Sequence, residues 1–177
     1  MTTARPYGLS WCLPFALLSL GEVELRTRPA EELAEAERWL NQAASAAEQF
    51  GNGQVVDMAT LLLAELDLQR GNPGAALERL REAAGGYAVA AVRAAALLAS
   101  GRPREAFALA SESLRAAESE GDRPGGLEAR RVMALALAAT GDLAASRRQL
   151  AEGLRMARRM GHRLAEQRME AAQRGTG

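Results

Sequence analysis

Apolar residues recur at helical spacing along almost the whole chain, in runs that glycines interrupt at regular intervals. Gly71, Gly101 and Gly141 each follow an apolar run, and an alanine lies seven residues before each of them. A second set of glycines lies between these units at spacings of 35, 35 and 40 residues: Gly51, Gly86, Gly121 and Gly161. Glycine directly after a helix supplies a left-handed C-terminal cap. The pattern therefore predicts an all-α fold of helices joined by short turns.

Small residues recur five and twelve positions after the first set of glycines. They are Ala76 and Ala83, Ala106 and Ser113, and Ser146 and Gly153. Small side chains let a second helix approach closely, so each glycine is predicted to join two packed helices. The residues expected to be buried between helices are Leu20, Gly21, Leu63, Ala64, Ala94, Met133 and Ala134.

The first apolar run, "YGLSWCLPFALLSLGEVEL" from Tyr7 to Leu25, could be read as an export signal, a lipid anchor or the first helix of the fold. Shifting the chain by 43 residues aligns "LGEVELRTR" with "LAELDLQRG", and a cleaved signal would have no internal copy. The bulky Trp11 before Cys12 does not fit a lipid-attachment motif. Glu22 ends the apolar run short of the ~20 residues that span a bilayer. We therefore expect the first helix of a fold and no membrane association.

The segments "GDLAASRRQLAEGL" and "GRPREAFALASESL" resemble the turn and second helix of the tetratricopeptide repeat (TPR), and "GNPGAALERLREA" is similar. This resemblance implies a right-handed α-solenoid of about four helix pairs with a C-terminal capping helix. The repeat domain would cover 14–174, between a lead-in at 1–13 and a tail at 175–177. Its parts would be 14–51, 54–85, 87–121, 124–161 and the cap 162–174. The cap "HRLAEQRMEAAQR" places apolar residues on one face and polar residues around them.

The chain departs from the family pattern in several places. The large aromatic residues of the first helix are missing, Arg93 takes a position that Leu63 and Met133 fill in other repeats, and the first turn "TRPAE" has no glycine. Long repeats rich in alanine and arginine, with phrases such as "AEGLRMARRMGHR", are most similar to the TPR regions of MalT-like and LuxR-type bacterial regulators. That similarity implies a role in transcription regulation.

Composition excludes several kinds of chemistry. All 22 basic residues are arginine, which removes the lysine that Walker-type nucleotide hydrolysis, Schiff-base catalysis and pyridoxal phosphate require. One cysteine and one histidine allow neither an internal disulfide nor a two-histidine metal site. Cys12 is interpreted as a small apolar residue, and His162 as a partner of the preceding helix end. We expect no enzyme activity, no metal, no cofactor and a cytoplasmic location.

Charge is balanced overall and uneven locally. Residues 141–177 hold eight arginines and four acids, whereas residues 31–51 hold five acids and one arginine. These ends are interpreted as solvated helix faces, with head-to-tail self-association or docking on another domain as the alternative. Direct nucleic-acid binding is not expected, because no aromatic residues are interleaved with the arginines and no recognition-helix motif is visible. The arginines in question are Arg147, Arg148, Arg155, Arg158 and Arg159.

The first helix of each TPR pair lines the concave side of the array, so the resemblance implies a groove for a protein or peptide segment. The polar ends of this groove would be Leu18, Glu22, Arg26, Leu61, Glu65, Gln69, Glu128 and Arg131. Its smooth middle would be Ala91, Ala95 and Leu98. Such a groove suits a segment with an apolar centre between charges, and Glu22 and Glu65 would favour an arginine or lysine on it.

Three function classes follow from these observations. The first is an interaction or effector-sensing segment of a bacterial transcriptional regulator. The second is a stand-alone adaptor or scaffold that binds a peptide in its groove, and an enzyme comes third. No ATPase module precedes the repeats and no DNA-binding helix-turn-helix motif follows "AAQRGTG". We therefore expect either a fragment of a larger regulator or a small independent protein.

Overall fold

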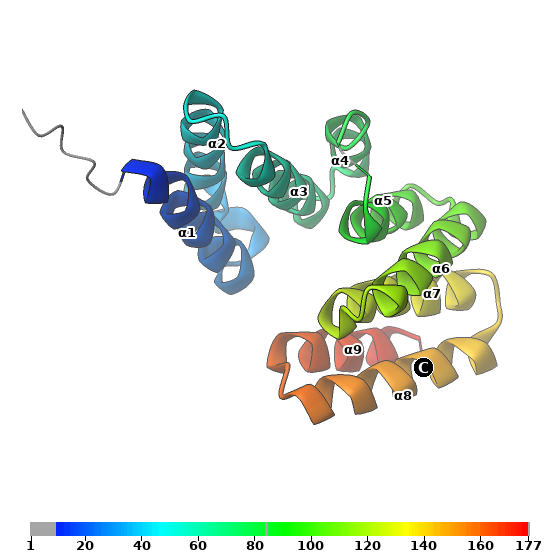
Figure 1. Cartoon of the computed structure of the whole chain (residues 1–177). Helices are drawn as coiled ribbons and strands as arrows, with labels where there is room; N and C mark the ends of the chain where they lie inside the picture. The colour runs from blue at the N-terminus through cyan, green and yellow to red at the C-terminus, as the bar shows by residue number, and fades with distance from the viewer. Residues whose placement is uncertain (1–9, 84, 177) are drawn as a thin grey trace, which may run out of the picture. The chain divides into compact units, whose positions relative to one another are not determined.

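The computed structural model describes residues 10–83 and 85–176, and within these ranges the backbone is helical and contains no strand (Figure 1). The α-helices are α1 (Leu13–Thr27), α2 (Ala34–Gln49), α3 (Gly53–Gln69), α4 (Pro73–Arg79), α5 (Tyr87–Ala99), α6 (Pro103–Ser119), α7 (Arg123–Ala139), α8 (Leu143–Met160) and α9 (Arg163–Gly175). Two short 3-10 helices, η1 (Ser10–Cys12) and η2 (Ala30–Glu32), precede α1 and α2. The prediction of an all-α fold is confirmed.

Six of the glycines that the sequence places after helices have a positive φ between 65° and 93°: Gly51, Gly71, Gly101, Gly121, Gly141 and Gly161. Gly86 was expected to follow a helix in the same way, but it instead precedes α5 in an extended conformation, and the α1–α2 connection has no glycine. Gly161 ends α8 with φ of 65°, and the amide of His162 then donates to the carbonyl of Ala157 at 2.9 Å. This arrangement satisfies the last carbonyl groups of the helix. The side chain of His162 was expected to contact α8, but its Nδ1 instead accepts from the amide of Ala165 at 3.3 Å and caps the start of α9.

The chain divides into two compact units, Met1–Arg70 and Gly71–Gly177. In the first unit α2 packs against both α1 and α3. Gly21 permits the close approach of α1 and α2, because a Cβ there would lie 2.6 Å from Leu40 Cδ2. The core between the helices is built mainly from Leu25, Leu33, Leu40, Val55 and Leu66. Leu20 was expected in this core but is 48% exposed, because it lies on the side of α1 away from α2.

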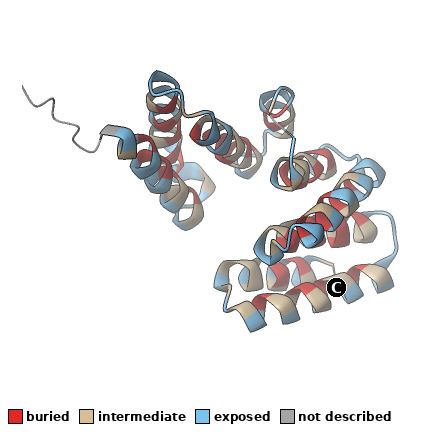
Figure 2. Cartoon of the chain, in the orientation of Figure 1, coloured by how far each residue is buried: buried red, intermediate tan, exposed pale blue. Residues whose placement is uncertain are grey.

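In the second unit α5 packs against α6, α6 against α7, and α7 against α8. The start of α5 lies beside the later part of α6, where the hydroxyl of Ser113 donates to the carbonyl of Tyr87 at 2.6 Å, so the two helices run in opposite directions. The helix α9 covers α7 and α8 and buries Met169 among Leu127, Leu150 and Ala157. Figure 2 shows buried residues on the facing sides of these helices.

The boundary between the units falls inside the predicted pair 54–85. Its first helix, α3, packs in the first unit, and its short second helix, α4, packs against α5 in the second. Four residues that were predicted to be buried between helices are buried: Ala64, Ala94, Met133 and Ala134. The small residues Ser113 and Ser146 are buried as well. The helical phase predicted for α3, α5 and α7 is thus confirmed.

A hydrogen bond links the start of α5 to the turn between α6 and α7. The hydroxyl of Tyr87, at the start of α5, donates to Asp122, which follows α6 and also caps α7 by accepting from the amide of Gly125. The bond to the Asp122 carboxylate raises the pKa of Tyr87 above its ordinary value, and burial adds to this. The phenol is therefore a stable donor at neutral pH, and it ties α5 to the α6–α7 turn.

Candidate protein-binding surface

The predicted groove residues of the first unit meet where α1 and α3 lie side by side. The guanidinium of Arg26 on α1 binds the carboxylate of Glu65 on α3, with Nη2 at 3.3 Å from Oε1. The same Nη2 is 3.5 Å from a carboxylate oxygen of Glu22. One turn further on, the amide of Gln69 donates to the carbonyl of Leu25 at 3.4 Å. The structure therefore brings Glu22, Arg26, Glu65 and Gln69 into one polar cluster.

Arg26 offsets one of the two negative charges in this cluster. Sequence reasoning expected Glu22 and Glu65 to form an acidic wall that attracts a cationic partner, but Arg26 lies between them and binds both. The Glu65 side chain is 19% exposed, whereas that of Glu22 is 47% exposed. Glu22 is thus the more accessible carboxylate for a partner. The contact of Arg26 with Glu22, at 3.5 Å and with the carboxylate half exposed, is therefore the one that a partner would displace more readily than the contact with Glu65.

The apolar members of the predicted groove are less accessible than the sequence suggested. Leu18 is 4% exposed and belongs to the core of the first unit, which corrects its assignment as a contact residue. The α1 face that carries it turns toward α2 and α3 because it continues the apolar stripe of Leu25. Leu61 is half-buried and retains some accessible surface.

In the second unit the predicted residues lie along α5 and α7, which contact each other, and α7 also contacts α9. Glu128 and Arg131 are one turn apart on α7 and form a two-pronged ion pair, with Nε at 3.0 Å and Nη2 at 2.5 Å from the carboxylate. Arg168 on α9 approaches Glu128 to 3.6 Å. Of the predicted smooth middle on α5, Ala91 is buried, and Ala95 and Leu98 are half-buried.

A buried arginine that the sequence did not reveal connects three helices of this unit. Arg130 on α7 is 6% exposed and donates to Gln149 at 2.7 Å and to Glu152 at 3.1 Å, both on α8. Its other terminal nitrogen donates to Glu118 on α6 at 3.1 Å. The sequence signal is weak, because "EARRV" shows two adjacent arginines without saying which one faces the core. This residue orients α6 and α8 around α7.

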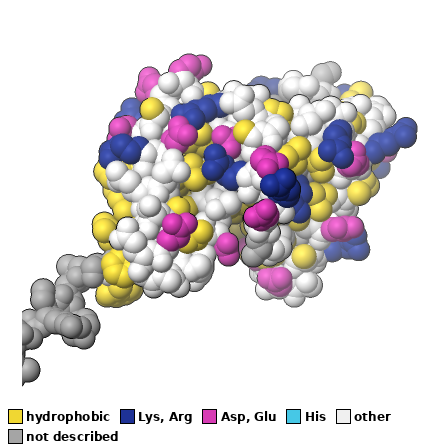
Figure 3. Space-filling view, turned by 90° about the horizontal axis from the view of Figure 1, so that it is seen from above, with side chains coloured by type: hydrophobic (Ala, Val, Ile, Leu, Met, Phe, Trp, Pro, Cys, Tyr) yellow, Lys and Arg dark blue, Asp and Glu magenta, His cyan; other side chains and the backbone are white. Residues whose placement is uncertain are grey.

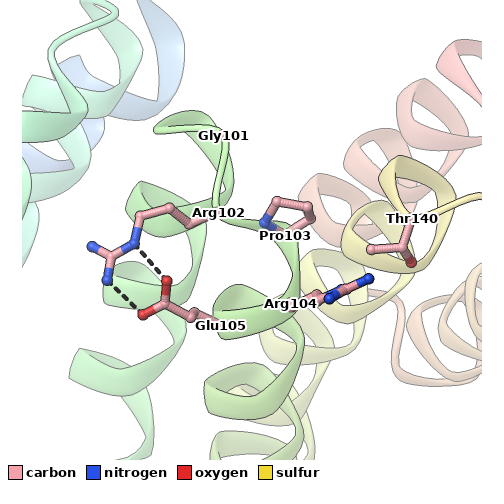
Figure 4. Close-up of a pocket in the computed structure, with 6 residues that line it drawn as sticks. All are labelled: Gly101, Arg102, Pro103, Arg104, Glu105 and Thr140. Carbon is pink, nitrogen blue, oxygen red and sulfur yellow. Dashed lines mark hydrogen bonds and ion pairs between the residues drawn. The ribbon is translucent and has the colours of Figure 1, made fainter.

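Two shallow depressions lie elsewhere on the second unit. One, of about 320 Å³, is lined by the start of α6 and by Thr140 (Figure 4). In it Arg102 and Glu105 form an ion pair that lowers the pKa of Glu105, chiefly through its hydrogen bonds, so both groups are already satisfied. The other, of about 220 Å³, is lined by Arg123, Met156, Arg159 and Met160. Both methionines are half-buried and pack against the core cluster formed by Leu127, Leu150 and Met169.

Other chemical features of the described residues are sparse. Cys12 is half-buried at the start of α1. Within residues 10–83 and 85–176, no three His, Cys, Asp or Glu side chains come together in a way that could hold a metal ion. In the same part of the chain no helix combines the length and the apolar character needed to cross a membrane.

Comparison with known proteins adds no assignment. No protein-family model matches the chain, and a search of curated proteins finds no significant match. The candidate surface therefore stands on the geometry of the first helices in each unit.

Proposed function

We propose that this chain is a non-enzymatic helical-repeat segment of the TPR type that binds a protein segment on the surface formed by its first helices. The setting that fits the sequence resemblance is the cytoplasm of a bacterium, in or beside a MalT-like transcriptional regulator. A right-handed solenoid arrangement of the helix pairs is part of this proposal.

The observation that carries the proposal is the contact between successive first helices. In the first unit α1 contacts α3, and in the second unit α5 contacts α7. The capping helix α9 contacts α7 in the same way. Residues 22 and 65, which are equivalent under the 43-residue shift, share Arg26 as a partner. Glu128 and Arg168 are likewise neighbours across α7 and α9. Repeated contacts of this kind support the proposal that the first helices of each unit share one binding face.

The chemistry of this face indicates the kind of segment it would bind. Ala95 and Leu98 offer half-buried apolar surface, and Glu128, Arg131 and Arg168 offer charges beside it. In the second unit, a segment with an apolar centre and flanking charges fits this pattern. In the first unit, Glu22 would favour a basic side chain on a bound segment. Apolar contacts would set the affinity, and the charges would set orientation and specificity.

The alternative function is a stand-alone adaptor that binds a peptide segment on the same surface. The regulator and the adaptor functions differ in what the partner protein does and not in how it is bound. A partner that carries an ATPase or DNA-binding module would favour the regulator, whereas an unrelated client would favour the adaptor.

Affinity capture with matched variants tests the proposal. We expect wild-type protein to capture a discrete partner from lysate of the source cell, and Glu22→Arg to lose at least one captured protein. Glu22 is preferred to Glu65 for this test because Glu65 is the less exposed partner of Arg26, so its replacement would also break an internal ion pair.

Glu48→Arg is the control, because Glu48 is an exposed acid on α2, outside the first-helix surface. It should capture the same proteins as wild type. Identical partner sets from Glu22→Arg and wild type would remove this carboxylate from the binding surface. Failure of every bait to capture a partner would contradict a protein-binding function.

A further inference from the structure

Two arginines line the smaller depression of the second unit, and neither is paired with an acid. The depression, of about 220 Å³, lies between the start of α7, which supplies Arg123, and the end of α8, which supplies Met156, Arg159 and Met160. Over the face drawn in Figure 3, by contrast, most basic side chains lie next to acidic ones. Within residues 10–83 and 85–176, neither the Arg123 nor the Arg159 guanidinium forms an ion pair or a hydrogen bond. Both positive charges are therefore available to a ligand.

The acids that flank these residues along the chain bind other groups. They are Asp122, which accepts from Tyr87 and from the amide of Gly125, Glu128, which binds Arg131 and Arg168, Glu152, which binds Arg130, and Glu166, which binds Arg158. From Gly153 to Ala165 the sequence contains four arginines and no acid. The two unpaired guanidiniums therefore favour a negative charge that comes from another molecule.

Two methionines give the depression an apolar floor between these charges. Met156 and Met160 lie one turn apart on α8, and each buries part of its side chain against the core of the second unit. Methionine side chains are unbranched and polarisable, so they adapt to the shape of a bound group and are common at binding surfaces. The site thus combines adaptable apolar surface with one cation from each of two helices.

We propose that this depression binds an acidic segment of a partner protein, in which an apolar side chain contacts the two methionines and flanking carboxylates pair with Arg123 and Arg159. Guanidinium groups suit this role because they bind carboxylates through two parallel hydrogen bonds. The site goes beyond the first-helix surface, because it lies at the end of a second helix and selects the opposite charge.

The size of the depression favours a protein segment over a free small molecule. Pockets that enclose small ligands have volumes of roughly 300–1,000 Å³, whereas this one has about 220 Å³. It therefore fits a single side chain that a larger partner presents. Arginine and methionine are also both enriched where proteins contact each other.

The lining residues favour protein over nucleic acid. Single strands are bound by aromatic side chains that stack on the bases along a positive groove, and methionines lie between the cations here. The exposed Arg155, one turn before Arg159, adds a single further cation. Phosphate binding relies on more numerous cations, and this chain holds equal numbers of basic and acidic residues.

Selection from a displayed library of random peptides about nine residues long tests this site. We expect the peptides that bind wild type, but not the double variant Arg123→Gln, Arg159→Gln, to carry Asp or Glu on both sides of a large apolar residue. In fluorescence anisotropy the most enriched of these peptides should bind the double variant about tenfold more weakly or worse, because two charged hydrogen-bonded pairs are lost. Replacing the apolar residue of the peptide by serine should also weaken binding. Both arginines are exposed, so far-UV circular dichroism of the variant should match wild type.

The matched control is Arg147→Gln, Arg148→Gln, which removes the same charge from exposed positions of α8 roughly 12 Å along the helix from Met156. It should bind the selected peptide like wild type. The first turn of α8, with Ala144, is roughly 18 Å from Met156 and also lies outside the site.

Three results would overturn the proposal: no enrichment of acidic peptides, equal affinity of wild type and the Arg123→Gln, Arg159→Gln variant, or tighter binding of a single-stranded oligonucleotide than of the peptide. Peptides bound at the first-helix surface would instead carry a basic residue and be lost with Glu22→Arg. Failure of the arginine site is therefore distinguishable from failure of the proposed function.

Discussion

Ala134→Phe is expected to destabilise the second unit by roughly 1 to 3 kcal/mol, since overpacking a filled core has a cost of this size. Ala134 on α7 is fully buried beside Leu127, Leu150 and Met169, with no space for a ring. Urea unfolding should show a lower midpoint at an unchanged slope.

The matched control is Ala139→Phe, at an exposed position near the end of the same helix. Exposed substitutions usually change stability by about 0.5 kcal/mol or less, so its midpoint should stay close to wild type. Equal midpoints for the two variants would show that the buried face of α7 is wrongly assigned. Ala64, fully buried on α3, provides the same test in the first unit.

Removing α9 by ending the chain after Gly161 should lower stability by about 3 kcal/mol, because the buried Met169 side chain alone contributes about 1.5–3 kcal/mol and Leu150 loses part of its cover. An unpartnered repeat face should also reduce solubility. Thermal unfolding and sedimentation velocity of the shortened chain report both effects.

Met169→Ala in the full chain tests whether the packing of this one side chain accounts for the stability that α9 contributes. This variant should reproduce much of the stability loss of the shortened chain, since replacing a buried methionine by alanine typically lowers stability by about 2–5 kcal/mol. Ala171→Glu, on the exposed side of α9, should be close to neutral. If the shortened chain melted and sedimented like the full one, α9 would not be a capping helix.

The helices and turns of this fold could be predicted from the sequence because local features specify them. Left-handed turns require glycine, and close helix pairs require small residues, so Gly161 and Ser113 can be recognised without a structure. The same logic failed at Leu20, which was assigned as buried because its copy Leu63 should be. Position in a repeat defines which face packs, but burial also requires a neighbouring helix, and no helix in the described part of the chain covers that side of α1.

The candidate surface was predictable in outline only. The 43-residue repeat correctly brought Glu22 and Glu65 together, but the ion pair of Arg26 with both depends on side-chain conformations that spacing does not specify. Arg130 was missed for a related reason, since one step along a helix turns a side chain by about 100° and decides whether an arginine is solvated or buried. Burial of Arg130 also needs Glu118, Gln149 and Glu152, which come from two other helices.

Site-specific photocrosslinking in the source cell tests the central proposal most directly, namely that the first helices of both units bind a protein segment. A photoreactive phenylalanine would replace Glu22 on α1 or Glu128 on α7, with Gln42 on α2 and Ala144 on α8 as exposed positions on second helices. We predict protein adducts from positions 22 and 128 and none from positions 42 and 144. Adducts from the second-helix positions alone, or equal yields from all four, would contradict the assignment of the binding surface.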